Sequence, residues 1–256
     1  MAPNDIDVQH ILAHTFVARA EYYPSIPSTN DRAKQCAAQG PGELPLLVAA
    51  DQQTAGRGRG ASRWWTGRGS LAFSLLLDAA TLGADRGRSP LGALAAAVAI
   101  VDTVAPLAPA HGVGIHWPND VYAAGGKLAG ILVEVLPDRR HVVGIGLNTN
   151  NSLAEFPAEL QQKATTLLDL SGRQHDQTTI LTTLLANLEA NFRLLATSPE
   201  RTGARADQLC LQRGQTLTLE LGQESFTGRC AGIAPDGALV LEMPEGKRSF
   251  YSGIPS

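Results

Sequence analysis

Short apolar runs bounded by glycine, proline, asparagine or aspartate predict the β-strands of the first part of the chain. These runs cover residues 45–54, 69–78, 113–117, 127–136 and 139–148. The last three follow one another closely and are separated by turn-forming residues. This spacing predicts that they pair sequentially and antiparallel.

Helices are predicted by their N-terminal signals. Ser28 with Asp31 three residues later fits a capping box, in which a serine side chain accepts a bond from a backbone N–H of the first turn. The alanine-rich residues 89–105 begin with Ser89 as N-cap and Pro90 in the first turn, a combination typical of a helix start. The second of these helices is rich in alanine but contains Asp102, which predicts a buried helix and not a membrane span.

The second half of the chain changes from helix to strand. Helices are predicted over 157–170 and over 177–196, the latter capped by Asp176. From about residue 209 the pattern alternates with a period of two and contains regular turn signals, including the Pro-Asp-Gly at 235–237. We therefore predict an α+β fold, a mixed sheet with helices packed on it, followed by a small SH3-like β-barrel.

The predicted domains are 1–208 and 209–256. A β unit of this size is near the lower limit for independent folding, so we expect it to lean on the larger domain.

Composition narrows the class of protein. The chain has 256 residues, is 44% hydrophobic and 18% charged, and carries a formal net charge of −3. A small negative charge disfavours a protein that coats nucleic acid or anionic membrane, so any cationic site must be local. Three dispersed cysteines indicate reduced thiols, and no signal peptide or membrane span is recognised. These features predict a cytoplasmic location.

Residues 55–65, "AGRGRGASRWW", form the most unusual stretch and are called the Gly/Arg loop below. Its glycines permit close approach to a ligand, and Arg57 and Arg59 place fixed charges among backbone N–H groups, as in an anion-binding nest. The loop lacks the ending of a P-loop and the strand–turn–helix context of a dinucleotide motif. By itself it is equally compatible with a solvated turn and with an anion site, and less so with an RNA contact.

Two other stretches carry candidate chemistry. Ser28, Thr29 and Asn30 display several donors and acceptors at a helix N-terminus, where a small polar group can bind. Lys127 enters an apolar strand, where it either reaches to water or faces a negative ligand. Asp120, in "WPND", suits a hard cation such as Mg²⁺ or a role in orienting that lysine, although the same residues also fit a simple turn.

Weaker candidates remain. Asn148 and Asn150 end a strand and fit a turn as well as a site. His10 and His14 have the spacing of a zinc pair but lack the glutamate of a zinc-protease helix, so a metal there is not expected.

In order and approximate spacing, "STN", "QTAGRGRG…W", "WPND", "GGKLAGILVE" and "GIGLNTN" resemble the motifs of biotin–protein ligases, also called biotin–[acetyl-CoA-carboxylase] ligases. The resemblance runs from about Ser28 to the C-terminus, including "GIAPDGALVLE". It implies a catalytic domain similar to class II synthetases. It also implies a reaction in two steps: biotin and ATP give biotinyl-5′-AMP and pyrophosphate, and a lysine of a biotin carboxyl carrier protein then accepts the biotinyl group.

The resemblance also implies roles for residues at matching motif positions. Lys127, Arg57 and Asp120 are expected to be catalytic, with Asp120 as the residue for Mg²⁺. The residues expected to contact biotin are Ser28, Thr29, Asn30, Gln53, Arg57, Gly58, Arg59 and Lys127. Those expected to contact ATP are Arg59, Trp64, Asn119, Lys127 and Asn148.

Two departures from the family pattern stand out. The loop commonly reads Gly-Arg-Gly-Arg-Arg-Gly, whereas Gly60 and Ala61 occupy its last two positions here. A lysine usually precedes "WPND", whereas this chain has His116, which can make a phosphate contact weaker or pH-dependent.

The remaining expectations concern partners. Only 27 residues precede Ser28, fewer than the helix-turn-helix domain that some family members carry, so a monofunctional ligase without DNA binding is expected. For the oligomeric state, both a monomer and a homodimer are compatible with the sequence. The nearest rival, a lipoate–protein ligase, shares the acyl-adenylate chemistry, and the loop together with "WPND" favours biotin.

Overall fold

A seven-stranded mixed sheet forms the centre of the protein, whose computed structural model describes residues 5–40, 42–82 and 90–255. The strand order is β1-β2-β3-β7-β6-β5-β4, and every neighbouring pair is antiparallel except β1 and β2. The strands are β1 (Arg19–Tyr23), β2 (Leu46–Ala50), β3 (Leu71–Leu77), β4 (Val113–His116), β5 (Asp120–Ala123), β6 (Gly126–Val135) and β7 (His141–Leu147). The predicted sequential antiparallel pairing is confirmed for β6 and β7, whereas β4 pairs with β5, a strand that was not predicted and that lies between β4 and β6.

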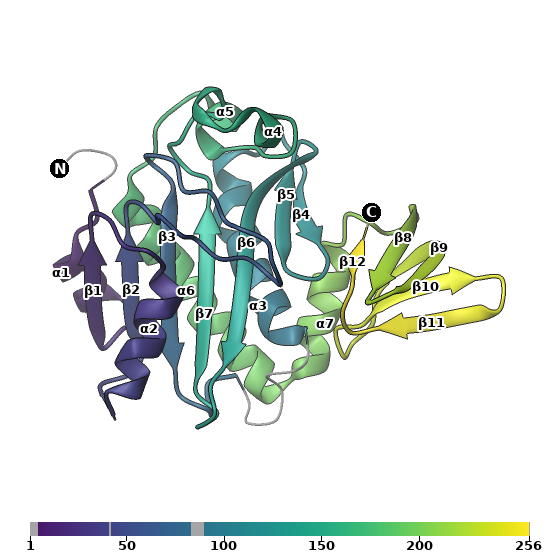
Figure 1. Ribbon diagram of the computed structural model, residues 1–256, viewed down its shortest axis with the longest axis horizontal. Coiled ribbons are helices and arrows are strands. Elements are labelled where there is room, and N and C mark those ends of the chain that lie inside the picture. The colour runs from purple at the N-terminus through teal and green to yellow at the C-terminus, as the bar shows by residue number, and fades with distance from the viewer. Residues whose placement is uncertain (1–4, 41, 83–89, 256) are drawn as a thin grey trace.

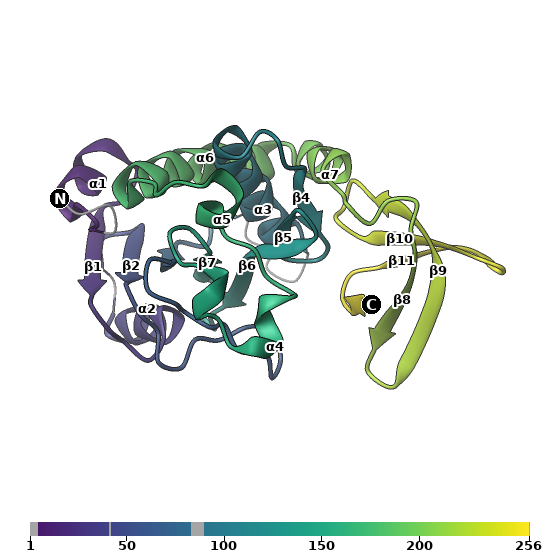
Figure 2. The same cartoon turned by 90° about the horizontal axis from the view of Figure 1, so that it is seen from above.

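Helices cover both faces of this sheet (Figure 1). On one face α2 (Thr29–Ala38) packs against β2, β3 and β7. On the other, α3 (Leu91–Val104) lies between the sheet and α6 (Gln177–Thr197), as the view from above shows (Figure 2). Because nearly all side chains of α3 are buried and many are alanine, the helix fits closely between its two neighbours.

A second, antiparallel sheet of five strands lies beside the first, in the order β11-β10-β9-β8-β12 (Figure 1). Its strands are β8 (Thr216–Leu221), β9 (Glu224–Ile233), β10 (Leu239–Met243), β11 (Gly246–Phe250) and β12 (Ile254–Pro255). The predicted α+β fold with a small C-terminal β unit is thus confirmed. The domain boundary at residue 209 stays a prediction. It follows the end of α7 (Pro199–Gln208).

The two sheets share one hydrophobic core. Buried side chains of the small sheet belong to the same cluster as those of α3 and α6. Polar contacts add to this junction: the backbone N–H of Trp117 donates to Oε1 of Gln212 (2.7 Å), and the indole Nε1 donates to the carbonyl of Gly237 (3.0 Å). The small sheet therefore leans on the larger domain, and Trp117 is a structural anchor between them.

Other helical segments are short: α1 (Val8–His14), the 3₁₀ turns at Ala105–Leu107 and Leu153–Glu155, α4 (Ala158–Gln161) and α5 (Leu167–Ser171). Within the described ranges no helix combines the length and apolarity needed to cross a membrane. The three cysteines are all unbridged.

The predicted helix over 157–170 is wrong, because the structure holds two short helices there. The residues between them pair with Lys127: its N–H donates to the carbonyl of Lys163 (2.8 Å), and its carbonyl accepts from the N–H of Thr165 (3.0 Å). Backbone groups used in this pairing are not free to continue a helix.

Three smaller predictions concern the residues of β5 and the caps of two helices. Residues from Asp120 to Ala123, where no strand was predicted, form β5 because they pair with β4 on one side and β6 on the other. The cap of α6 by Asp176 is confirmed, since its carboxylate accepts a bond from the N–H of Thr179. The proposed cap Ser89 lies outside the described residues.

Candidate active site

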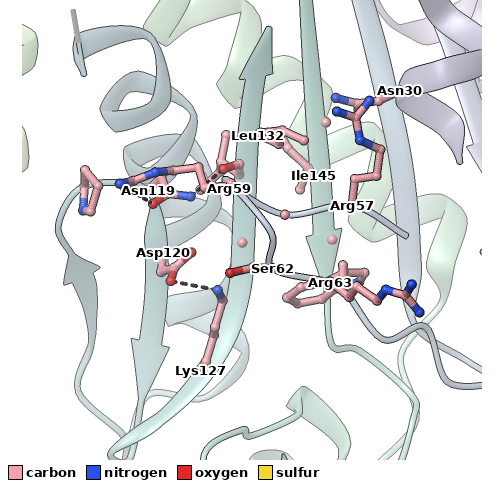
Figure 3. A pocket seen from close by; sticks show the side chains of 18 of the residues that line it. Asn30, Arg57, Arg59, Ser62, Arg63, Asn119, Asp120, Lys127, Leu132 and Ile145 are labelled. Carbon is pink, nitrogen blue, oxygen red and sulfur yellow. Dashed lines mark hydrogen bonds and ion pairs between the residues drawn. The ribbon is translucent and has the colours of Figure 1, made fainter. Parts of the chain in front are cut away.

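A cavity of about 660 Å³ opens between the Gly/Arg loop, the strands β5 to β7 and the C-terminal tail. The loop crosses in front of the sheet, and polar side chains approach the space from both sides of it (Figure 3). Apolar side chains also line it, among them Phe73, Ile131, Leu132 and Ile145. The cavity therefore suits a ligand with an apolar middle and polar ends.

One end of the cavity is a network of uncharged donors and acceptors at the start of α2. Ser28 caps the helix, its Oγ accepting from the N–H of Asp31 (3.4 Å), which confirms the predicted cap. Thr29 donates from both its N–H (2.9 Å) and its Oγ1 (3.1 Å) to Oε1 of Gln53. Among the described residues none accepts from the Gln53 Nε2, so this amide group is available to a ligand.

Asn30 belongs to the same end. Its Oδ1 lies 2.6 Å from the hydroxyl of Ser74, and its Nδ2 donates to Oε2 of Glu134 (2.8 Å). Both ends of the amide therefore have partners, and all of these side chains are held in single orientations. The arrangement can recognise a small group that carries N–H donors and a carbonyl acceptor.

Glycines form the floor of the cavity. Gly144 and Gly146 lie two residues apart on one face of β7, and Gly130 of β6 pairs with Gly146. A Cβ at Gly144 would overlap the Asn30 amide, and a Cβ at Gly146 would overlap the ring of Trp64. The floor is therefore bare backbone because side chains from other elements occupy the space above it.

The other end of the cavity is charged. Nζ of Lys127 lies 2.7 Å from Oδ2 of Asp120, and 5.8 Å from the ring centroid of Trp64. The second carboxylate oxygen of Asp120 is buried and has no hydrogen-bond partner in the described part of the chain. An unpartnered buried acceptor beside a lysine is a place where a cation or a ligand donor is stabilised.

His116 lines the same end and stacks on Tyr122, with ring centroids 4.6 Å apart. Burial lowers the pKa of this histidine, with the nearby Asp120 acting against the shift and Lys127 adding to it. His116 is accordingly neutral at pH 7. Lys127 is thus accompanied here by a neutral ring, not by a second fixed charge.

The two arginines of the Gly/Arg loop point in different directions (Figure 3). Arg59 is half-buried and donates to Oδ1 of Asn119 (3.0 Å) and to the carbonyl of Gly253 in the C-terminal tail (2.8 Å). Arg57 extends towards α2, where Nη1 lies 2.7 Å from Oδ1 of Asp31 and 3.5 Å from Oε1 of Glu134. The loop is therefore fastened on both sides of the cavity.

The structure brings nearly all of the sequence-predicted site residues to this one cavity. Those that line it are Ser28, Thr29, Asn30, Gln53, Arg57, Gly58, Arg59, Trp64, Asn119, Asp120 and Lys127. Asn148 is the exception: its buried amide donates to the carbonyls of Lys127 (3.3 Å) and Thr165 (3.0 Å). It supports the backbone behind Lys127, and its predicted contact with a nucleotide stays a prediction.

Sequence reasoning missed several residues of the site. Ser74 and Glu134 hold Asn30, yet each looks like an ordinary strand residue in the sequence. The tail residues 253–255 reach the cavity only because β12 pairs with β8. The glycines of "GIGLN" carried a usable signal, since alternate glycines in a strand mark a close approach by another group.

The departure at Gly60 and Ala61 lies at the exposed tip of the loop. Gly60 adopts a positive φ of 58°, and a Cβ there would meet no atom within 4 Å. A larger residue at position 60 would therefore fit sterically. The advantage of glycine is that it adopts a left-handed backbone without strain.

Comparison with known proteins agrees with this geometry. Residues 22–150, just over half of the chain, match the model of the biotin/lipoate A/B protein ligase family, and residues 214–254 match the biotin protein ligase C-terminal domain. The chain is 35% identical over 225 residues to a biotin–[acetyl-CoA-carboxylase] ligase of Mycobacterium tuberculosis, covering 84% of this chain and 80% of that protein. It is 32% identical over 238 residues to the bifunctional ligase/repressor BirA of Bacillus spizizenii, covering 90% of this chain and 71% of that protein.

A solved structure gives the same result for the fold. The biotin protein ligase from Aquifex aeolicus, in complex with biotin and ATP, superimposes with a TM-score of 0.80 at 27% identity. The match covers 93% of this chain and 97% of that one, so both sheets are included. Together with the cavity, these matches lead to one conclusion: the chain belongs to the biotin/lipoate A/B protein ligase family, as a biotin protein ligase.

Proposed function

We propose that this protein activates biotin with ATP to biotinyl-5′-AMP and transfers the biotinyl group to a lysine of a biotin carboxyl carrier protein. The observation that carries the proposal is the division of one cavity into an uncharged hydrogen-bonding end and a charged end. A ureido ring carries two N–H donors and one carbonyl acceptor, which suits the amide and hydroxyl groups at the first end. A carboxylate and a triphosphate suit the second.

In the first step a biotin carboxylate oxygen attacks the α-phosphorus of ATP, and the bond to the pyrophosphate oxygen breaks. Both reactants are anionic, so the barrier falls when fixed cations offset their repulsion and hold them in line. Lys127, at the charged end of the cavity, is proposed to bind the carboxylate and an α-phosphate oxygen. Arg59, fixed by Asn119 and Gly253, is proposed to contribute the second charge.

Asp120 is proposed to orient Lys127 through the 2.7 Å ion pair. Without that partner, a lysine side chain samples many rotamers, and ordering it would oppose the reaction. The same carboxylate has a buried, unpartnered Oδ1, and this observation fits a role as a ligand for Mg²⁺. Asp120 would be the residue of this chain that holds the ion, because Mg²⁺ is usually bound through one or two carboxylates together with the phosphates of the substrate.

Mg²⁺ would supply charge neutralisation on the phosphates when bound. The residues of this chain would do the rest: the Gly/Arg loop covers the product, and Arg57 ties the loop to α2. Such a cover matters because the mixed anhydride of biotin and AMP is hydrolysed by water.

In the second step the amine of the carrier lysine attacks the acyl carbon, the bond to the phosphate oxygen breaks, and AMP leaves. The attacking amine loses a proton in this step. Biotin carboxyl carrier protein of acetyl-CoA carboxylase is the proposed acceptor, in line with the relatives named for that activity. The free thiols of all three cysteines support the cytoplasm as the compartment in which the reaction takes place.

Biotin-dependent exchange of labelled pyrophosphate into ATP tests the proposal. We expect exchange with biotin and none with lipoate. Exchange with lipoate alone would move the protein to the lipoate ligases, and exchange with neither acid would reject an acyl-adenylate enzyme.

A further inference from the structure

Glu134 lies towards the end of β6 and outside the cavity lining, but its carboxylate contacts both α2 and the Gly/Arg loop. Oε2 accepts from the Asn30 amide (2.8 Å), whereas Oε1 lies 3.0 Å from Nζ of Lys34 and 3.5 Å from Nη1 of Arg57. Its side chain is 23% exposed, so most of it is shielded from water. One carboxylate therefore joins the uncharged end of the cavity to the Gly/Arg loop.

The contact with Asn30 decides which way that amide faces. The hydroxyl of Ser74 lies 2.6 Å from Oδ1, and only the Nδ2 group has hydrogens to donate to a carboxylate. If the amide turned over, its oxygen would face the Glu134 carboxylate and the bond to Glu134 would be lost, whereas the Ser74 hydroxyl can accept as well as donate. A negative charge at Glu134 therefore keeps the Asn30 amide in one orientation against Gly144.

The contact with Arg57 belongs to a ring of four charges. Asp31 Oδ1 is 2.7 Å from Arg57 and 2.8 Å from Lys34, so each cation lies between the two carboxylates. These residues come from α2, β6 and the loop. The loop is also held from outside by the bond from the N–H of Ala55 to the carbonyl of Pro27 (2.9 Å) and by the bonds of Arg59, whereas the bond from the N–H of Gly58 to the carbonyl of Ser62 is internal.

We infer that Glu134 is a positioning residue that couples biotin binding to the closure of the Gly/Arg loop. Its charge fixes the Asn30 amide and tethers Arg57, so the ligand pocket and its cover share one anchor. This inference rests on the proposed function, which supplies biotin as the ligand, but the contacts of Glu134 with Asn30 and Arg57 are present without a ligand. Single exposed ion pairs contribute little, whereas a shared, partly buried carboxylate with charge-assisted bonds contributes more.

The test is Glu134→Gln, which keeps the shape of the side chain and removes the charge. In pyrophosphate exchange we expect the KM for biotin to rise about tenfold, because charge-assisted bonds are lost, while the KM for ATP and kcat stay within about twofold. Glu134→Asp restores the charge on a shorter arm and should recover part of the biotin affinity. Glu242→Gln is the matched control, because it removes a carboxylate from another lysine pair, Glu242–Lys247 (3.0 Å), in the small sheet.

The second readout is limited proteolysis of the Gly/Arg loop, which can also be measured without a ligand. Trypsin cleaves after arginine, and the loop carries Arg57, Arg59 and Arg63. We expect Glu134→Gln to speed cleavage in the loop several-fold in the free protein, and biotin to protect the unchanged protein more than the variant. Cleavage after Arg193, exposed on α6, serves as the internal reference for general loosening.

The inference is overturned if loop cleavage is unchanged, if it accelerates no more than cleavage after Arg193, or if it accelerates without a change in the KM for biotin. A failed proposed function has a different signature. In that case the unchanged protein exchanges no pyrophosphate with biotin, while loop cleavage still responds to Glu134→Gln.

Discussion

The Nζ atom of Lys127 lies 2.7 Å from Oδ2 of Asp120, across the hairpin that joins β5 to β6. The two residues are seven positions apart, and an irregularity in the strand pairing between Val121 and Tyr122 sets their register. The lysine is thus held at the charged end of the cavity before any ligand arrives. This pair is the centre of the proposed chemistry.

Lys127→Ala is expected to reduce the rate of biotin adenylation well over tenfold, a barrier increase of about 1.4 kcal/mol or more. The reason is the loss of the cation proposed to bridge carboxylate and α-phosphate. Single-turnover formation of biotinyl-5′-AMP measures the effect. Lys247→Ala, which removes an exposed lysine from the small sheet, is the control, and near-normal activity of Lys127→Ala would remove this residue from the mechanism.

Asp120→Asn is expected to lower the adenylation rate and to raise the Mg²⁺ concentration needed for half-maximal activity. The amide keeps the size of the side chain but loses the charge that faces both Lys127 and the proposed ion. Titration of activity with Mg²⁺ at saturating ATP separates the two roles. An unchanged Mg²⁺ requirement would leave Asp120 with the orientation of Lys127 alone.

Gly144→Ala is expected to weaken biotin binding strongly, because the new Cβ overlaps the amide of Asn30 and must displace it. Loss of the Asn30 contacts with Ser74 and Glu134 would leave buried polar groups unpaired, at a cost of about 1–3 kcal/mol each. Isothermal titration with biotin measures the change. Gly92→Ala in α3, where the nearest atom to the new Cβ lies at 3.8 Å, should bind biotin normally, and equal behaviour of the two variants would contradict the steric account.

Gln212→Ala tests the junction between the sheets. It leaves the buried N–H of Trp117 without its acceptor, and we expect a loss of about 1–3 kcal/mol in the free energy of unfolding. Urea unfolding followed by tryptophan fluorescence measures it. Gln161→Ala, whose side chain bonds the carbonyl of Phe156 far from the junction, is the comparison. If Gln212→Ala lowered the free energy of unfolding less than Gln161→Ala, the bond between Trp117 and Gln212 would not be what stabilises the junction.

The carboxylate of Glu21 is expected to contribute to the free energy of unfolding in a way that depends on pH. Burial pushes the pKa of Glu21 up, but hydrogen bonds from Arg32 and Tyr23 and the charges of Arg32 and Arg19 outweigh it and lower the pKa from 4.5 to about 2. A carboxyl group with a lowered pKa in the folded state stabilises the protein above pH 4.5, and this contribution disappears as the pH falls to about 2.

Glu21→Gln should therefore reduce the free energy of unfolding at pH 7 by at most about 3 kcal/mol, and by much less near pH 2 to 3. Urea midpoints of both proteins across this range measure the difference. Glu189→Gln, which breaks a pair with Arg193 on the surface of α6, controls for charge removal in general. A pH-independent difference between Glu21→Gln and the unchanged protein would refute the linkage.

Local signals in the sequence were sufficient to predict several of the main strands and helices of this protein. Apolar runs predicted β2, β3, β6 and β7, and the caps at Ser28 and Asp176 predicted where α2 and α6 begin. These features depend on neighbours within a few residues, so they can be recognised without a fold. Five motifs in order then indicated the family, and nearly all the residues they marked line one cavity.

The tertiary structure decided what depends on distant partners. Residues 162–166 leave the helix because Lys127 takes their backbone bonds, and β5 is a strand because β4 and β6 enclose it. Arg57 and Arg59, two positions apart, serve opposite sides of the cavity because Asp31 and Gly253 attract them there. Glu134 acquires its place in the site only when the fold brings it within reach of Asn30 and Lys34 on α2. The sequence by itself determined which chemical groups are present, whereas the packing of elements far apart in the chain determined which of them meet.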